Sequence, residues 1–344
     1  MLFRTPPLTE HDLAVIRSIE MYRQQLRAFL SQPKRWKGQL RRNLRARAIR
    51  GSNSIEGYDV SLDDAIALVE GDEALDADQR TVAEVTGYRN AMTYVQQLAE
   101  DPHFHFDPSL LRGLHFMMLG HDLAKSPGSY RSGEIFVRGE NADEVVYVGP
   151  EANIVDPLMQ DLLGQLEHLD DNIGESPVFV TAAMAHLNLV MIHPFRDGNG
   201  RMARCLQTMI LARNQILAPE FSSIAEWLGR NTQAYYEVLN QVGERSWHPE
   251  NDASQWVQFN LAAHYMQAQT IVARVERTRH HIRAPKCAPG ITQAAPGPEF
   301  SGLRPVRVTL FGLYPDFRRE PLAVAVGFEP TVESPPHTLS RRAP

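Results

Sequence analysis

The 344-residue sequence contains only two cysteines, Cys205 and Cys287, and no long run of apolar residues. Two cysteines are too few for the disulfide framework that stabilises small secreted domains. The first residues also lack the basic segment and long apolar stretch of a secretory signal. Because no apolar run approaches the length of a membrane span, we expect a protein of the reducing cytoplasm that makes no membrane contact.

An excess of positive charge is missing as well. The chain carries 35 Lys and Arg against 41 Asp and Glu, a formal net charge of −6. Such a protein does not attract nucleic acid over its whole surface. The exception is residues 34–50, which hold eight basic residues and no acidic one. Aromatic residues do not alternate with these bases, so we favour a solvated helix face over a nucleic-acid or acidic-partner patch.

Most of the chain has apolar residues at the three- and four-residue spacing that predicts helices. The segments that fit are 9–50, 59–70, 79–100, 108–119, 153–169, 179–192, 202–211, 224–242 and 253–279. The segment 179–192 is apolar almost all round, so we expect it to be the central buried helix. Between 127 and 150, two short β-rich runs around a polar turn predict a hairpin. The sequence therefore predicts an all-α fold with one β-hairpin.

The composition changes abruptly at Pro285. Residues 285–344 hold nearly half of the 23 prolines and have no sustained apolar periodicity. A segment of this composition has no regular apolar face with which to pack a core. We expect either a disordered tail or the readthrough of a damaged gene end.

The most informative segment is residues 193–204, with the sequence HPFRDGNGRMAR. Gly198 and Gly200 allow a tight turn and let a ligand approach the main chain. The buried helix predicted after them places this turn at a helix N-terminus. Free N–H groups and the helix dipole favour an anion there.

The side chains of this segment suggest phosphate chemistry. Arg201 and Arg204 are three residues apart, so both can point from the first helical turn toward one phosphate chain. Asp197 beside such phosphates needs a divalent cation, which suggests Mg²⁺ held by this carboxylate and phosphate oxygens. His193 can accept a proton near neutral pH. The set predicts a polyphosphate site with a base at its mouth, the alternative being a purely structural turn.

The segment resembles the Fic family signature, His-x-Phe-x-(Asp/Glu)-Gly-Asn-Gly-Arg-x-x-Arg, with every fixed position filled. The resemblance implies transfer of AMP from ATP to a hydroxyl side chain of a target protein. It makes His193 the base, Asp197 the Mg²⁺ ligand and Phe195 a core anchor of the loop. The nucleotide-binding residues that it implies are Gly198, Asn199 and Gly200 in an anion hole, Arg201 and Arg204.

Residues 52–57, SNSIEG, resemble the family's inhibitory-helix motif, (Ser/Thr)-x-x-x-Glu-(Gly/Asn), N-terminal to the core. The resemblance implies that Glu56 pairs with Arg204 and fills the space of the γ-phosphate. Ser52 and Glu56 are four residues apart, which predicts that they share a helical face. The alternative is that residues 52–54 cap the start of a helix and Glu56 is an ordinary surface residue.

Three further features bear on the site. The hairpin within 128–150 follows Gly-x-Tyr-Arg and is similar to the family's target-docking flap, with exposed edges near 134–148 that suit a target segment. Tyr235 and Tyr236 resemble a Tyr-Tyr pair that bounds the adenine pocket, although they could equally be core and rim residues. His186 lies seven residues before His193, and we favour a hydrogen-bonded core histidine over a metal ligand.

These observations predict four regions: a helical region 1–105 with the inhibitory motif, a Fic core 106–220, helices within 221–284 that complete the nucleotide pocket, and the tail 285–344. The activity implied is that of a protein adenylyltransferase inhibited by Glu56, with ATP and a target protein as partners. Oligomerisation is left open. Removal of AMP at the same site and a nucleotide-sensing regulator without transferase activity are the alternatives, and the intact His193 argues against the sensor.

Overall fold

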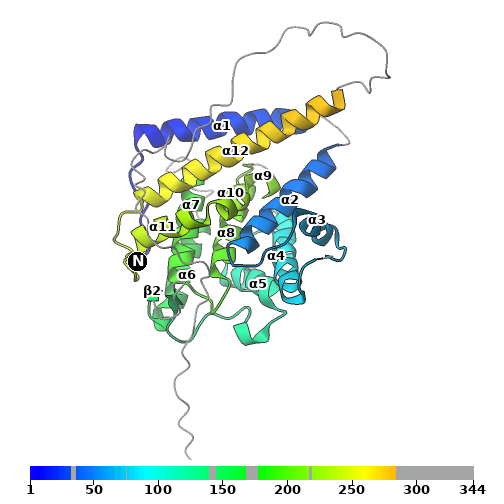
Figure 1. Ribbon diagram of the computed structural model, residues 1–344. Helices are drawn as coiled ribbons and strands as arrows, with labels where there is room; N and C mark the ends of the chain where they lie inside the picture. The colour runs from blue at the N-terminus through cyan, green and yellow to red at the C-terminus, as the bar shows by residue number, and fades with distance from the viewer. Residues whose placement is uncertain (32–35, 75, 139–144, 168–176, 217–218, 284–344) are drawn as a thin grey trace, which may run out of the picture.

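The computed structural model describes residues 1–31, 36–74, 76–138, 145–167, 177–216 and 219–283, and the tail 285–344 lies outside them. Within these ranges the chain is mostly helical (Figure 1). The elements are α1 (Glu10–Ser31), α2 (Trp36–Ser54), α3 (Leu62–Glu70), α4 (Gln79–Leu98), α5 (Pro108–Leu119), a 3₁₀ turn η1 (Leu123–Lys125), β1 (Phe136–Arg138), β2 (Val145–Val148), α6 (Ala152–Glu167), α7 (Val178–Ile192), α8 (Asn199–Arg213), α9 (Pro219–Ser222), α10 (Ala225–Arg230), α11 (Thr232–Gly243) and α12 (Ser254–Arg283). The predicted all-α fold with one hairpin is confirmed for the described residues.

Helices α7 and α8 form the centre of the core and pack extensively against each other. Nearly every side chain of both helices is buried, whichever way it points. Burial of apolar surface contributes about 25 cal/mol per Å². A helix that is apolar on all sides therefore has its lowest free energy in the middle of the protein. The prediction of a central buried helix at 179–192 is confirmed.

The loop between these two helices is shaped by two left-handed residues. At the end of α7, His193 has φ 51° and its N–H donates to Leu189 O at 3.0 Å. Before α8, Gly198 has φ 76°, a conformation that glycine adopts without strain. Helix α8 starts at Asn199, three residues earlier than the apolar run predicts. The free N–H groups of its first turn consequently lie at the loop.

The hairpin pairs β1 with β2 in antiparallel register. Phe136 lies opposite Val148, and Val137 lies opposite Tyr147. Val137 and Tyr147 are buried, so one face of the hairpin covers the core. The predicted hairpin is confirmed, and its turn at residues 139–144 lies outside the described residues.

Helix α2 crosses α10 at very short backbone distance. A Cβ on Gly51 would lie 2.4 Å from Ala225 O, and a Cβ on Gly229 would lie 2.6 Å from Gly51 O. Both contacts are far inside van der Waals distance, so only glycine fits at either position. The crossing fixes the C-terminal end of α2, which carries Ser52, against the body of the protein.

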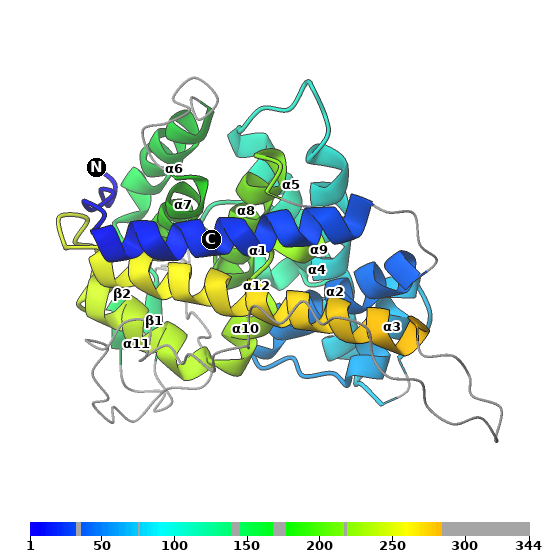
Figure 2. The same ribbon diagram turned by 90° about the horizontal axis from the view of Figure 1, so that it is seen from above.

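Helices α1 and α12 lie side by side in both views (Figures 1 and 2). Together with α2 and α9 they enclose a second apolar cluster, which includes Leu26, Leu44, Phe221 and Ile271. None of the helices in the described ranges combines the length and the apolar character of a membrane span.

The basic segment 34–50 falls largely on α2. Among the described residues, Arg42 pairs with Glu70 at 2.9 Å and Arg47 with Glu226 at 3.5 Å. These intramolecular pairs fit the interpretation as a solvated helix face. The alternative of a patch for nucleic acid or an acidic partner stays a prediction.

The structure resolves the predicted helical segments into separate helices. The segment 9–50, predicted to be helical, contains two helices, and the segment 224–242, predicted as a helix or a helix pair, contains the pair α10 and α11. Residues 52–54 end α2, so the alternative that they start a helix is wrong. Glu56 lies beyond α2 in a turn, where its N–H donates to Asn53 O at 3.0 Å. The shared helical face of Ser52 and Glu56 is therefore absent, because the helix ends between them.

Candidate active site

A pocket lies where the loop between α7 and α8 meets α11, the hairpin and the turn after α2. Its lining includes His193, Asp197, Gly198, Asn199, Gly200, Arg204, Glu56, Tyr235, Tyr236, Val137 and Tyr147. The structure thus brings nearly all of the predicted site residues to one cavity. Ser52 and Arg201 do not line it, and each contacts another part of the site.

His193 is oriented by its own helix. Its Nδ1–H donates to Val190 O at 2.9 Å, which leaves Nε2 to carry the lone pair of the neutral ring. Burial lowers the pKa of His193 to about 4. The imidazole is therefore neutral at pH 7, the form that a general base requires.

Arg131 ties the base of the hairpin to this loop. Its Nε donates to His193 O at 2.8 Å, and its Nη2 donates to Pro150 O at 2.5 Å. Its backbone N–H also donates to Pro194 O at 2.8 Å. Arg131 is the arginine of the Gly-x-Tyr-Arg sequence, so this sequence acts as a connection between the hairpin and the site.

The loop is closed from inside by Phe195 and Asn199. The Asn199 side chain accepts the Phe195 N–H and donates to Phe195 O, both at 2.9 Å. The buried Phe195 ring stacks on His115 with centroids 3.8 Å apart. His115 in turn donates from Nε2 to Asp197 O at 2.9 Å. The Asn199 amide thus holds the loop in shape, and its backbone N–H at the start of α8 can serve an anion hole.

Arg204 is held by the turn after α2. Its Nη2 pairs with Glu56 Oε1 at 2.6 Å, and its Nε donates to Ser52 Oγ at 2.8 Å. Burial alone would lower the pKa of Arg204, but the Glu56 carboxylate raises it above its ordinary value. The Nη1 atom of Arg204 is buried and has no hydrogen-bond partner among the described residues. The predicted pairing of Glu56 with Arg204 is present in the structure.

Gly200 provides the room for this pair. A Cβ at position 200 would lie 2.5 Å from Glu56 Oε1 and 3.1 Å from Arg204 Nη1. Any side chain here would displace the Glu56 carboxylate. Gly200 is thus needed for the Glu56–Arg204 pair as well as for the predicted anion hole.

Arg201 does not share the phosphate-facing direction that its spacing predicts. Its Nη1 pairs with Glu84 Oε2 at 2.5 Å, and its guanidinium lies 5.4 Å from the centroid of the Tyr58 ring. In this structure Arg201 therefore does not line the pocket beside Arg204, and its predicted contact with the phosphates stays a prediction. Three residues along a helix rotate the side chain enough to meet a different neighbour, and here that neighbour is a buried carboxylate of α4.

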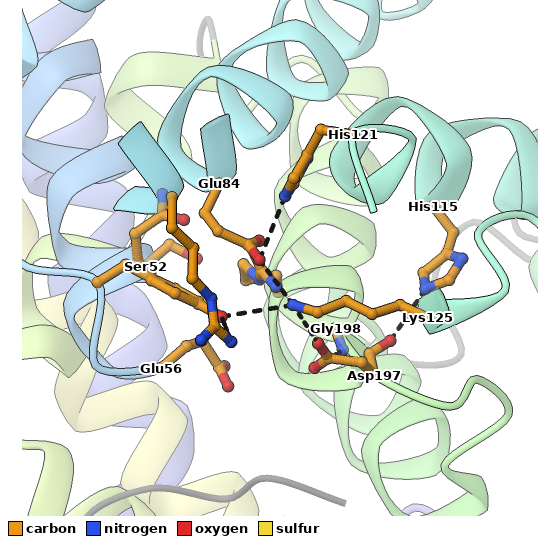
Figure 3. A network of polar contacts seen from close by, with 12 residues as sticks. Ser52, Glu56, Glu84, His115, His121, Lys125, Asp197 and Gly198 are labelled. Carbon is orange, nitrogen blue, oxygen red and sulfur yellow. Dashed lines mark hydrogen bonds and ion pairs between the residues drawn. The ribbon is translucent and has the colours of Figure 1, made fainter. Parts of the chain in front are cut away.

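Glu84 and Lys125 extend this contact to Asp197 (Figure 3). Lys125 Nζ lies 2.6 Å from Glu84 Oε1 and 2.7 Å from Asp197 Oδ2. Burial would raise the pKa of Glu84, but Arg201 and Lys125 lower it to about 2. Burial would likewise raise the pKa of Asp197, which Arg201 and Lys125 hold below its ordinary value.

The sequence analysis missed Glu84, Lys125 and His115. One signal was available, because Glu84 interrupts the apolar stripe of the predicted helix at 79–100 with a charged side chain. Such a position requires a buried partner. The sequence offers no means to tell which cation that partner is.

Asp197 is the one predicted metal ligand, and we tested whether it fits Mg²⁺. Its Oδ1 accepts the Gly198 N–H at 2.5 Å, and its Oδ2 pairs with Lys125. Among the described residues, no three His, Cys, Asp or Glu side chains cluster as a metal site. Mg²⁺ commonly binds one carboxylate together with substrate phosphates and water. A pocket-lining Asp197 beside phosphates fits that mode, whereas an all-protein metal cage does not fit.

The two tyrosines lie at the pocket wall and also in the core. Tyr235 donates from its hydroxyl to His186 Nε2 at 3.0 Å, and His186 donates from Nδ1 to Gln207 at 2.6 Å. The prediction of His186 as a hydrogen-bonded core histidine is confirmed. Tyr236 donates to Ile55 O at 3.1 Å, so α11 also holds the turn that carries Glu56.

Comparisons with known proteins find similarity to this chain in both sequence and fold. Residues 105–211 match the family model described as Fic/DOC family. A protein named Protein adenylyltransferase Fic from Nematostella vectensis is 31% identical over 199 residues, which are 56% of this chain and 42% of that protein. Its namesake from Aedes aegypti is 29% identical over 170 residues, 47% of this chain and 31% of that protein. The chain thus spans less than half the length of these curated relatives.

Solved structures extend the likeness beyond the matched core. A Fic family protein from Desulfovibrio desulfuricans G20 aligns with TM-score 0.65 and 25% identity over 80% of this chain and 77% of that one. A Fic domain containing signaling protein from Bacteroides thetaiotaomicron aligns with TM-score 0.61 and 19% identity over 76% of this chain and 98% of that one. The molecule is therefore a Fic-fold protein. The filled signature in the loop 193–204 lies within residues 105–211, the part of the chain that matches the Fic/DOC family model.

Proposed function

We propose that this protein is a protein adenylyltransferase, which transfers AMP from ATP to a hydroxyl side chain of a target protein. The observation that carries the proposal is the composition of one pocket. The same cavity is lined by the neutral His193, by the N-terminus of the buried helix α8 and by Arg204. The Nη1 atom of Arg204 has no hydrogen-bond partner among the described residues. The name shared by the curated relatives supports the same activity.

In the proposed reaction His193 acts as the general base. Nε2 takes the proton from the target hydroxyl, and the hydroxyl oxygen attacks the α-phosphorus of ATP. A new P–O bond to the target forms, the bond between the α-phosphorus and the bridging oxygen breaks, and pyrophosphate leaves. The hydrogen bond from Nδ1 to Val190 O holds the ring in the required tautomer.

Charge on the phosphates is met by the start of α8 and by Arg204. Free N–H groups in the first turn of a helix, together with its dipole, favour phosphate oxygens. The unpartnered Nη1 of Arg204 supplies a further donor beside Gly200. Mg²⁺, when bound at Asp197 and phosphate oxygens, would neutralise the developing charge. Positioning and electrostatics then supply most of the rate acceleration.

Glu56 would keep this site inactive. Its carboxylate lies on Arg204 and against Gly200, where it repels a γ-phosphate and occupies its space. Ser52 and Tyr236 hold the same turn in place. Activation then requires the turn to leave Arg204, as binding of a partner or loss of the carboxylate would allow.

The hairpin is the proposed place for the target protein. Arg131 connects its base to the loop of His193, so a segment paired with the hairpin near 134–148 would lie close to the base. Pairing of an extended segment with a strand edge is a common mode of peptide recognition. A cytoplasmic location stays an expectation from the sequence, which leaves homo-oligomerisation open.

The proposal is tested by incubating the purified full chain with Mg²⁺ and ATP labelled at the α-phosphate, alone and with a cell lysate. Covalent label on the chain or a lysate protein supports the transferase, above all in a Glu56→Gly variant. ATP labelled at the γ-phosphate is the control, because AMP transfer leaves no γ-label. Reversible binding without covalent label in both chains would favour the nucleotide sensor instead.

A further inference from the structure

One ammonium group contacts two carboxylates, and one of these, Asp197, lines the pocket. Lys125 is the last residue of the η1 turn, and its Nζ lies 2.7 Å from Asp197 Oδ2 and 2.6 Å from Glu84 Oε1. The Tyr58 hydroxyl lies 3.4 Å away. Figure 3 shows the side chain reaching between the two acids. Only 13% of the lysine side chain is exposed, so this is an enclosed contact and not a surface ion pair.

The local charges are already balanced before any ligand binds. Two cations, Lys125 and Arg201, face two anions, Asp197 and Glu84, through contacts of 2.5 to 2.7 Å. A divalent ion added at Asp197 would place its charge beside the lysine ammonium. At such short range, in a partly buried site, like charges repel strongly.

We propose that Lys125 is a built-in counter-ion of Asp197 that competes with a divalent cation for this carboxylate. Metal binding then requires Lys125 Nζ to move away from Asp197 Oδ2. The ammonium group stays paired with Glu84 after this movement. Negative charge from nucleotide phosphates would shift the balance toward the metal. Lys125 therefore makes metal binding depend on nucleotide and acts as a positioning residue. The inference rests on the proposed function, which requires a nucleotide and Mg²⁺ to bind at this site.

An opposite role for Lys125 would be direct replacement of the metal, with Nζ bound to a phosphate oxygen. The two short carboxylate contacts argue against it, because both would have to break in a largely enclosed position. The two roles predict opposite effects of removing the lysine charge. Competition predicts tighter metal binding, whereas replacement predicts no change or weaker binding.

The test measures Mn²⁺ binding to the full chain without nucleotide, by the electron paramagnetic resonance signal of the free ion. Lys125→Met should bind Mn²⁺ about 10–100-fold more tightly than the parent, the range over which residues beside a metal ligand change affinity. Lys125→Arg keeps the positive charge, so its Mn²⁺ affinity should resemble that of the parent. Lys37→Met on α2 is the control for losing one lysine charge away from the site. The added variant Asp197→Asn should abolish the gain of Lys125→Met.

Unchanged or weaker Mn²⁺ binding by Lys125→Met would overturn the inference, and so would a gain that survives Asp197→Asn. Melting curves by circular dichroism check that each variant is folded, and Lys125→Gln provides a second uncharged variant. Because no AMP transfer is measured, the two proposals fail separately. A chain that never transfers AMP but shows the Mn²⁺ shift refutes only the function, and an active chain without the shift refutes only the role of Lys125.

Discussion

Helix α8 carries two arginines three residues apart, and each pairs with a glutamate from a distant part of the chain. Arg204 meets Glu56 at 2.6 Å, and Arg201 meets Glu84 at 2.5 Å. The two glutamates differ in their surroundings. Glu56 lies in a turn at the pocket with 12% of its side chain exposed, whereas Glu84 lies inside α4 with 1% exposed.

The same ion-pair chemistry can thus serve two purposes. Glu56 faces a cavity in which phosphate oxygens could take its place on Arg204. Glu84 also holds Lys125, and breaking a buried pair leaves an uncompensated charge away from water. Burial and the number of partners therefore decide whether a carboxylate can be released or must stay. The predictions below test this distinction.

The largest effect on AMP transfer is expected from removing the proposed base, His193, in a chain whose Glu56–Arg204 pair is already broken. In a Glu56→Gly background, His193→Ala should reduce AMP transfer by about 10²–10⁴-fold, the usual contribution of a general base. ATP affinity should stay within a few-fold, because the imidazole meets the hydroxyl and not the phosphates. Labelling with α-labelled ATP and calorimetric ATP binding measure both. Retention of a tenth of the activity would exclude His193 as the base.

The next effect separates the two glutamates by activity. Glu56→Gly should raise AMP transfer at least about tenfold, equivalent to about 1.4 kcal/mol of barrier, because Arg204 becomes free for phosphate. Glu84→Gln should not activate, since it leaves the Glu56 pair intact. Arg204→Ala is the control, because it breaks the pair but removes the phosphate contact too. Activation by Glu84→Gln equal to that by Glu56→Gly would remove the distinction.

The free energy of unfolding should also distinguish the two pairs, but here the larger effect is expected at Glu84. Glu84→Gln should lower the free energy of unfolding by about 3–5 kcal/mol, because Arg201 and Lys125 lose a buried partner. Glu56→Gln should lower it by about 1 kcal/mol, since its hydrogen bond to Arg204 lies beside the open pocket. Guanidinium denaturation of the two variants measures both changes. Equal losses would show that burial does not distinguish the pairs.

The loss of stability between pH 6.5 and pH 4 should come mainly from buried histidines. Burial lowers the pKa of His193 and His115 to about 4, and that of His186 and His264 to about 3. Their folded pKa values lie below the unfolded value of about 6.5. The unfolded chain therefore binds more protons below that pH. Stability is full above pH 6.5 and falls toward pH 4, by up to about 1.4 kcal/mol per pH unit for each histidine.

Glu84 sharpens this pH test. Its pKa of about 2 lies below its ordinary value, so its contribution is present above pH 4.5 and is lost only as the pH falls toward 2. Glu84→Gln should thus lower stability equally at pH 7.5 and pH 5.5. Denaturation curves of parent and variant at both values check this. A penalty that disappears at pH 5.5 would mean that Glu84 is already protonated there.

The smallest effect is expected from removing residues 285–344. The segment has no periodic apolar face, so its loss should leave the melting temperature and ATP binding nearly unchanged. Both glutamate pairs should respond to mutation as they do in the full chain. A fall of many degrees would show that the segment packs against the described helices.

Much of the site could be predicted because its signals are local. The glycines at 198 and 200, the histidine at 193 and the apolar helix after them lie within one short stretch. The turn and the helix N-terminus therefore follow from neighbours in sequence. The family resemblance added the pairing of Glu56 with Arg204, which the structure contains. The geometry behind that pairing was predicted wrongly, since Glu56 lies after the end of α2 and not on it.

The contacts of Arg201, Lys125 and Glu84 could not be predicted in the same way. Their positions are 84, 125 and 201, on three elements whose relative placement depends on how the helices pack. Periodicity shows that a residue faces the core, but it does not show which partner it meets there. Arg201 is the example, because its guanidinium pairs with a buried carboxylate of α4 that the sequence pattern did not identify as its partner.

The sequence by itself determined the helical class, the central buried helix, the hairpin and the loop with its base and glycines. These follow from apolar spacing and from backbone preferences that act over a few residues. Only the tertiary structure decided which cation meets which carboxylate, because ion pairing acts over a few ångströms between residues far apart in the chain. Helix packing brings such residues together. The close crossing of α2 and α10 at Gly51 and Gly229, for example, positions the end of α2 so that Ser52 and Glu56 contact Arg204.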